Sequence, residues 1–279
     1  MFHCRKKGSE GKLVCEVCPL RCELYPFQIG RCHIRRHIGT TVAMQPFGHL
    51  TSMAVEPIEK KPFVEFLPRS KTLSVGSYGC NLNCDFCENH EVSQGVMRKG
   101  KTYYPYELLK IAKDKGCESI CFTYSEPIVI ADYLFEVANL FHFHGLKVLA
   151  NTNGFAHYSL WSDFCKHVDA VNMDWKGSGT FGGRPHTERL LRNLVTAYKH
   201  NVHVEISVPL HYPVKDIVPE MEILADVLRR ACGSDIPCHL LRIYPAYRRI
   251  GLMPLSDGDM RDAQETLLKK NISSVYFFS

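Results

Sequence analysis

The fold is decided by the stretch Gly79-Cys80-Asn81-Leu82-Asn83-Cys84-Asp85-Phe86-Cys87. It follows directly on an apolar segment of strand length, residues 72–77. Three thiolates in a C-x3-C-x2-C spacing on one short loop can bind three irons of a cubane cluster, which leaves the fourth iron without a protein ligand. An iron left open in this way can coordinate a substrate. The alternatives are a zinc ion, for which His90 would be the fourth ligand, and three buried thiols.

Beyond this loop the chain alternates between strand-like and helix-like segments. Apolar runs of strand length lie at residues 72–77, 119–124, 146–151, 170–175, 202–210, 239–244 and, shorter, 274–278. Helical spacing of apolar residues occurs at residues 106–115, 130–144 and 188–200, with helix starts at Pro105, Pro185 and Ser256 and a stop at Gly145. Six or more βα units predict an α/β fold with a parallel sheet covered by helices. We expect a partial (βα)6 TIM-like barrel, since a complete eight-unit barrel typically needs about 250 residues.

Cysteines also mark the region before the barrel. Cys15, Cys18, Cys22 and Cys32 can form a closed Cys4 zinc site or ligate a second [4Fe-4S] cluster, and zinc or another structural metal is the favoured interpretation. We therefore divide the chain into a cysteine-rich metal knuckle (residues 1–39), an irregular connector with one hairpin (40–70) and the barrel (71–279). The remaining cysteines are isolated and are expected in strand or helix cores: Cys4, Cys117, Cys121, Cys165, Cys232 and Cys238.

The composition predicts a globular protein, and we expect it to be neither exported nor membrane-bound. Of 279 residues, 45% are hydrophobic and 23% are charged, residues 1–12 are polar and basic, and no apolar run approaches membrane-spanning length. Thirteen cysteines without an export signal predict reduced thiols and metal ligation in the cytoplasm rather than a disulfide framework. The net charge of +5 is scattered, so a nucleic-acid partner is not expected.

The C-x3-C-x2-C spacing, with the aromatic Phe86 before the last cysteine, resembles the signature of the radical S-adenosylmethionine (SAM) superfamily. The resemblance implies that Cys80, Cys84 and Cys87 hold a redox-active [4Fe-4S] cluster whose open iron is chelated by SAM. It also implies reductive cleavage of SAM to methionine and a 5′-deoxyadenosyl radical, which takes a hydrogen atom from the substrate. Phe86 would pack near the adenine.

Two strand ends carry further parts of the resemblance. Thr123-Tyr124-Ser125-Glu126-Pro127 resembles the Gly-Gly-Glu-Pro segment that holds the methionyl amine, with Tyr124 and Ser125 in place of the glycines. Glu126 would accept hydrogen bonds from the ammonium. Asn151-Thr-Asn153-Gly154 resembles the Asp-Thr-Asn-Gly of glycyl-radical-enzyme activases, and Asn153 would contact the ribose or the methionyl carboxylate. An ordinary helix start and an ordinary turn are the alternatives.

The later strand ends supply the remaining candidates. Asn172-Met-Asp174-Trp-Lys176 resembles the Asp-x-Lys of the same activases, in which two aspartates bind a monovalent cation beside SAM; Asn151 replaces the first of them here, which puts that cation in doubt. Lys176 would otherwise be a surface charge. Candidates on the substrate side of the barrel mouth are His211, Arg242, Tyr244 and Tyr247. The alternative is a structural role, which is the commoner one for single His or Tyr positions.

Over nearly the whole chain, the order of motifs resembles the radical SAM member of the AmmeMemoRadiSam system, a relative of pyruvate formate-lyase activating enzyme. The element Pro57-Ile-Glu-Lys-Lys-Pro62 is fairly specific to that group. Two departures are the segment Cys87-Glu-Asn-His90, where the group has Cys-Gln-Asn-Trp, and residues 208–213, which lack the Pro-Gly-x-Asn-Asp turn. The resemblance implies AMMECR1-like and MEMO-like partner proteins and an electron donor such as flavodoxin or ferredoxin.

Three functions are consistent with these patterns. The first is radical chemistry on an unknown small molecule, peptide or cofactor. The second is activation of a glycyl-radical partner protein. The third, of another class, is a non-catalytic iron–sulfur or zinc module, such as an electron carrier or a nucleic-acid adaptor. An electron carrier would need no SAM pocket.

Overall fold

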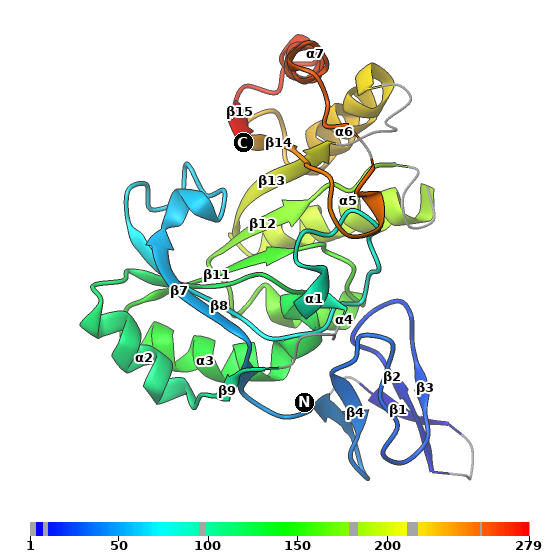
Figure 1. Cartoon of the computed structure of the whole chain (residues 1–279), viewed down its shortest axis with the longest axis vertical. Coiled ribbons are helices and arrows are strands. Elements are labelled where there is room, and N and C mark those ends of the chain that lie inside the picture. Colours follow the sequence, from blue (N-terminus) through cyan, green and yellow to red (C-terminus); the bar gives the residue numbers. More distant parts are fainter. Residues whose placement is uncertain are drawn as a thin grey trace.

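The computed structural model describes residues 4–7, 11–94, 99–178, 184–210, 217–251 and 253–278. Its centre is an eight-stranded sheet with the order β15-β14-β13-β12-β11-β10-β8-β7 (Figure 1). Seven strands pair in parallel and follow the predicted ones: β8 (Lys71–Gly76), β10 (Ser119–Phe122), β11 (Lys147–Thr152), β12 (Ala170–Asp174), β13 (His203–Leu210), β14 (Cys238–Arg242) and β15 (Val275–Phe278). The parallel sheet confirms the expected α/β class and the partial TIM-like barrel.

The helices that connect the strands are α2 (Pro105–Asp114), α3 (Ala131–Phe143), α4 (Tyr158–Phe164), α5 (Arg184–Lys199), α6 (Ile217–Ala231) and α7 (Asp257–Lys269). The predicted start at Ser256 is confirmed by a capping box. The Ser256 hydroxyl accepts a hydrogen bond from the Asp259 amide at 3.1 Å, and the Asp259 carboxylate accepts one from the Ser256 backbone amide. No helix among the residues placed by the structure is long and apolar enough to cross a membrane.

The two faces of the sheet carry different residues. Alternate side chains, such as Ile120 and Phe122 of β10, pack into the large core with the helices. The side chain between them, Cys121, faces the barrel interior and packs in a smaller cluster with Ile58 and Phe63. The barrel interior is thus filled in part by Ile58 and Phe63, which belong to a segment that precedes β8 in the chain.

The expectation of irregular structure over residues 40–70 is corrected by β7 (Ser52–Pro57), an edge strand of the main sheet. It pairs antiparallel with β8 along its whole length, from Ser52↔Gly76 to Pro57↔Lys71. Two short pieces, β5 (Val42–Met44) and β6 (His49–Leu50), precede it. Pro57 favoured irregular structure in the sequence, because proline cannot donate a ladder hydrogen bond. It lies at the end of an edge strand, where no such bond is lost.

Residues 62–66 close the bottom of the barrel. The carboxylate of Glu205, on β13, accepts hydrogen bonds from the backbone amides of Val64 and Glu65 at 3.0 Å and from His239 Nε2 at 2.6 Å. Asn172 Nδ2 donates to the carbonyl of Pro62 at 2.6 Å. Buried polar side chains of the sheet therefore satisfy the backbone of this loop, which we call the floor loop.

Glu205 is expected to make the stability of the fold depend on pH. Burial alone would raise the pKa of this carboxyl, but the hydrogen bonds from His203, His239 and Val64 lower it to about 2, from an ordinary value of 4.5. A lowered carboxyl pKa stabilises the fold above pH 4.5, and that contribution is lost as the pH falls towards 2. The shift corresponds to about 3 kcal/mol at neutral pH.

Urea unfolding of wild type and Glu205→Gln between pH 7 and pH 3 measures this contribution. The stability difference between the two proteins should be largest at pH 7 and shrink below pH 4.5. Glu222→Gln is the matched control, because Glu222 pairs with Lys270 on the surface with 45% of its side chain exposed, so little change is expected at any pH. A difference for Glu205→Gln that does not vary with pH would contradict the assignment.

The N-terminal segment forms a separate small sheet beside the barrel, built from β1 (Cys4–Lys7), β2 (Lys12–Cys15) and β3 (Glu23–Leu24), and a hairpin of β4 (Arg35–His37) and β5 (Figure 1). The Arg35 guanidinium joins it to the barrel: it donates to the Val129 carbonyl at 2.7 Å and lies 2.9 Å from the Asp132 carboxylate. The boundaries at residues 39 and 70 stay predictions.

Candidate functional site

The loop with the three cysteines leaves β8 and ends in the short helix α1 (His90–Ser93). Gly79 starts this loop with φ +92, a left-handed conformation that favours glycine, and an added Cβ would collide with the carbonyl oxygen of Cys32. The backbone amide of Leu82 donates to Cys80 Sγ at 3.3 Å. The glycine thus lets the cysteine loop turn tightly against the N-terminal segment.

The three thiols share one small cluster of side chains. Cys84 and Phe86 are buried in it, Cys80 and Cys87 pack against it, and Cys18 of the N-terminal segment and Phe155 also belong to it. Burial raises the pKa of Cys84 to about 11, although the nearby ammonium of Lys176 opposes this shift. A bound metal would keep such a thiol deprotonated.

The residues present fit a cubane cluster. Within the described part of the chain, no three His, Cys, Asp or Glu side chains converge closely enough to share one metal ion. Cubane ligation does not require that convergence, because each thiolate binds a different iron. His90, considered above as a zinc ligand, instead stacks on Tyr247 with ring centroids 4.5 Å apart.

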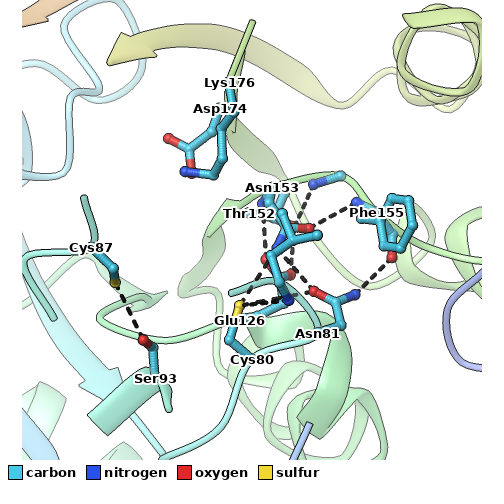
Figure 2. Close-up of polar contacts among 12 residues, drawn as sticks. Cys80, Asn81, Cys87, Ser93, Glu126, Thr152, Asn153, Phe155, Asp174 and Lys176 are labelled. Atoms are coloured by element: carbon cyan, nitrogen blue, oxygen red, sulfur yellow. Dashed lines mark hydrogen bonds and ion pairs between the residues drawn. The ribbon is translucent and has the colours of Figure 1, made fainter. Parts of the chain in front are cut away.

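Glu126 lies at the carboxyl end of the sheet, in the middle of a network of hydrogen bonds (Figure 2). It is 3% exposed, and its carboxylate accepts hydrogen bonds from Thr152 Oγ1 at 2.6 Å, Asn153 N at 2.9 Å and Ile128 N at 3.0 Å. Burial raises the pKa of this carboxyl to about 7, with the hydrogen bonds opposing the shift. Glu126 therefore ties the end of β11 to the segment after β10, and three of its roughly four acceptor positions are used.

Asn153 and Asn81 connect this carboxylate network to the cysteines. Asn153 Nδ2 lies 2.9 Å from Asn81 Oδ1 and 3.7 Å from Cys80 Sγ, and Asn81 Nδ2 donates to the Phe155 carbonyl at 2.7 Å (Figure 2). Asn81 and Thr152 are functional candidates that the sequence analysis missed. Both were visible beside residues that it named, since Asn81 follows Cys80 and Thr152 precedes Asn153.

Asp174 and Lys176 also reach this site. Lys176 Nζ lies 2.9 Å from Asp174 Oδ2 (Figure 2). The same nitrogen lies 5.8 Å from the centroid of the Phe86 ring. Burial alone would lower the pKa of Lys176, but Asp174 and the thiols of Cys84 and Cys80 hold it above its usual value. Lys176 is thus a fixed cation beside the cysteine loop rather than a solvated surface charge.

Tyr124 occupies a position where the resembled segment has glycine. Its φ of +65 lies in the left-handed region, which is unfavourable for a large side chain. The side chain is held by two contacts: its hydroxyl donates to Glu56 Oε2 at 3.0 Å, and Lys61 Nζ lies 4.5 Å from its ring centroid. Lys61 is 7% exposed and lies 2.6 Å from the same carboxylate. Glu56 and Lys61 thus hold a strained tyrosine next to Glu126, a role that their sequence pattern does not predict.

Of the substrate-side candidates, the structure brings Arg242 and Tyr244 together through a side-chain hydrogen bond. Tyr247 stacks on His90 of the cysteine loop, whereas Arg242 pairs with Asp257 at 2.5 Å and lines a surface pocket of about 360 Å³ with Phe277 and Phe278. Tyr244 is half exposed. His211 lies outside the described residues.

The four N-terminal cysteines interact electrostatically with one another, and Cys18 packs in the cluster of the cysteine loop; among the residues that the structure describes, no three of them converge on one metal-ion position. Cys15, Cys18 and Cys32 are buried, and burial raises the pKa of Cys15 to about 11 and of Cys18 to about 12. Backbone amides two residues further on donate to each of these sulfurs, from Val17, Leu20 and Ile34. This is the same arrangement that Leu82 makes with Cys80.

Comparisons with known proteins agree with this geometry. The family model described as "Radical SAM superfamily" matches residues 74–224, which is more than half of the chain. An uncharacterized protein of Methanocaldococcus jannaschii, MJ0808, is 26% identical over 281 residues that cover 99% of this chain and 83% of the relative. A 7-carboxy-7-deazaguanine synthase of Clostridium acetobutylicum is 29% identical over 99 residues, 35% of this chain and 43% of the synthase.

Among solved structures, SuiB of Streptococcus suis matches with a TM-score of 0.54 at 14% sequence identity. The match covers 73% of this chain but only 47% of SuiB, so the chain spans about half the length of that protein. At this identity the match shows the fold alone. The match agrees with the parallel α/β barrel described above.

Enzymes of this superfamily use SAM and a [4Fe-4S] cluster, and these are the cofactors of this chain. The loop with Cys80, Cys84 and Cys87 lies inside the matched region, as do the strand ends that carry Glu126, Asn153 and Lys176. The family model spans most of the barrel on which these groups converge. The chain is therefore an enzyme, and it belongs to the radical SAM superfamily.

Proposed function

We propose that this enzyme cleaves SAM reductively at a [4Fe-4S] cluster held by Cys80, Cys84 and Cys87, and that the resulting radical takes a hydrogen atom from a substrate in the barrel. The observation that carries the proposal is the convergence of the cysteine loop with Glu126, Asn153 and Lys176 at the carboxyl end of the sheet. In a parallel barrel, catalysis takes place at that end. The bound cluster supplies an electron and an open coordination site for SAM.

The chain's own residues would hold SAM around this cluster. Phe86 offers an apolar face for the adenine, and Lys176 offers a cation for the methionyl carboxylate. Glu126 and Ser125 follow the turn at Tyr124, so their backbone would face the methionyl amine. Asp174 fixes the Lys176 ammonium, and Asn153 lies between Glu126 and the Cys80 sulfur. These assignments define which side chains should affect SAM binding.

The test is anaerobic. Protein reconstituted with iron and sulfide is reduced with dithionite, mixed with SAM, and assayed for 5′-deoxyadenosine by chromatography. A second measurement asks whether SAM changes the electron paramagnetic resonance (EPR) spectrum of the reduced cluster. Production of 5′-deoxyadenosine or a SAM-dependent spectral change is the expected result. A loaded cluster that neither cleaves SAM nor responds to it would leave a non-catalytic iron–sulfur module as the better explanation.

We infer that the N-terminal cysteines also bind metal. Three of their sulfurs already receive backbone N–H groups, an arrangement suited to thiolate ligands. A Cys80/Cys84/Cys87→Ala triple variant is expected to keep metal at this second site. Elemental analysis then distinguishes about one zinc per chain from about four irons with sulfide. A triple variant free of both metals after purification and anaerobic reconstitution would contradict the proposal.

The substrate defines two versions of the function. Modification of a small molecule or a peptide is supported by what relatives act on or bind, since the synthase's name refers to a deazaguanine and SuiB has been solved with a precursor peptide. Activation of a glycyl-radical enzyme predicts a partner that becomes sensitive to oxygen after incubation with this protein. A flavodoxin or ferredoxin donor, AMMECR1-like and MEMO-like partners, and a cytoplasmic location stay predictions.

A further inference from the structure

Ser93 lies against the third cysteine of the loop. Its hydroxyl oxygen is 3.2 Å from Cys87 Sγ, and its side chain comes from the last residue of α1 (Figure 2). Ser93 is only 3% exposed. The contact is therefore a buried one, formed by a residue that lies outside the cysteine motif.

Gln94 fixes the direction of this hydrogen bond. Its side-chain nitrogen Nε2 donates to Ser93 Oγ at 3.1 Å and to the carbonyl oxygen of Leu82 at 3.3 Å, so both amide protons have acceptors. A lone pair of the Ser93 oxygen is then occupied, and its own proton is left for Cys87. A cysteine that binds metal is a thiolate, which only accepts hydrogen bonds. Ser93 must consequently be the donor whenever Cys87 holds a cluster.

We propose that Ser93, oriented by Gln94, donates a hydrogen bond to the Cys87 thiolate and raises the reduction potential of the [4Fe-4S] cluster. The proposal rests on the proposed function, in which Cys87 is a cluster ligand. Reduction adds one electron, taken from an external one-electron donor such as reduced flavodoxin or dithionite, and no bond is broken. The added charge strengthens the hydrogen bond, so the bond stabilises the reduced cluster more than the oxidised one. Ser93 and Gln94 are thus positioning residues for electron uptake.

The experiment is a redox titration of the reconstituted full-length enzyme, followed by the EPR signal that responds to SAM. Ser93→Ala is expected to reduce the equilibrium constant for one-electron reduction about tenfold. For a one-electron couple this is about 59 mV towards more negative potential. Ser93→Thr keeps the hydroxyl and should stay near the wild-type value. Gln94→Leu keeps Ser93 but removes the group that orients it, and a shift in the same direction is expected.

A second readout detects the proton itself. After exchange into D2O, pulsed EPR of the reduced cluster should show an exchangeable deuteron in wild type and in Ser93→Thr. That coupling should be lost in Ser93→Ala. A merely structural role of Ser93 would alter iron content without these two spectroscopic changes.

The outcomes separate clearly. Ser93→Ala with a full cluster and an unchanged potential would overturn the proposal. If Ser93→Ala does not take up iron, the Gln94→Leu variant decides the question. A more negative cluster potential in that variant supports the proposed hydrogen bond from Ser93, and an unchanged potential overturns it. Wild-type protein without any SAM-responsive cluster would overturn the proposed function itself, and this inference with it.

Discussion

Replacement of Cys84 by alanine is expected to abolish 5′-deoxyadenosine formation while the protein stays folded. Loss of a direct ligand should cost more than the roughly 10- to 100-fold that accompanies loss of a hydrogen-bond partner of a ligand. The stability cost should be small, about 1 kcal/mol, because Cys84 packs in a small satellite cluster rather than in the large core. Anaerobic 5′-deoxyadenosine formation, iron content and circular dichroism of the variant distinguish loss of activity, loss of the cluster and loss of the fold.

Cys165→Ala provides the matched control for that variant. Cys165 is also a buried cysteine, 3% exposed, but it packs in the large core and lies outside both cysteine groups. Its replacement should cost some stability and leave iron content and activity unchanged. The prediction fails if Cys84→Ala is grossly unfolded, or if it still forms 5′-deoxyadenosine at the rate of the control.

The second large effect concerns stability and is expected for Arg35→Met. The Arg35 side chain is 4% exposed, and its removal would leave the Asp132 carboxylate, 10% exposed, without its cation. Asp132 Oδ2 would keep the backbone amide of Met44 at 3.1 Å, which does not neutralise the charge. Breaking a buried ion pair by removing one partner costs about 3–5 kcal/mol. Urea unfolding at pH 7 should show a loss of this size.

Arg21→Met serves as the control for charge removal. Arg21 lies 2.7 Å from Glu16, a shorter distance than that between Arg35 and Asp132, but its side chain is 43% exposed. Exposed pairs typically contribute less than about 1 kcal/mol, so burial rather than distance should decide the outcome. Equal losses for the two variants would show that the Arg35 contact does not hold the N-terminal segment on the barrel.

Much of the barrel could be predicted because its strands are buried on both faces. Such strands form continuous apolar runs, and the predicted run at residues 170–175 corresponds to β12. The connector was less predictable, because β7 is an edge strand with a partly exposed pattern and a terminal proline. The helix α6 was missed, although its apolar residues Met221, Leu224 and Leu228 recur at helical spacing.

The site was predictable only where neighbouring residues in the sequence carry it. The three cysteines and Glu126 belong to short motifs, so their spacing pointed to them. Asn81 and Ser93 act through contacts with groups such as the Phe155 carbonyl, 74 residues away from Asn81, and the Cys87 sulfur. A single sequence does not show which distant strand end will meet a given side chain. Those partners follow from the order of strands in the folded sheet.

The floor loop has a mechanical consequence for the open barrel. Besides its bonds to Glu205 on β13, it reaches the last strand, where Glu65 accepts a hydrogen bond from Tyr276 at 3.0 Å. It also continues, through the chain, from the opposite edge strand β7. The floor loop thus connects the two edge strands of the sheet, β7 and β15, at the end of the barrel opposite the site. Widening of the barrel to admit a large substrate is therefore limited to the carboxyl end of the strands. Substrate and products enter and leave through that same end.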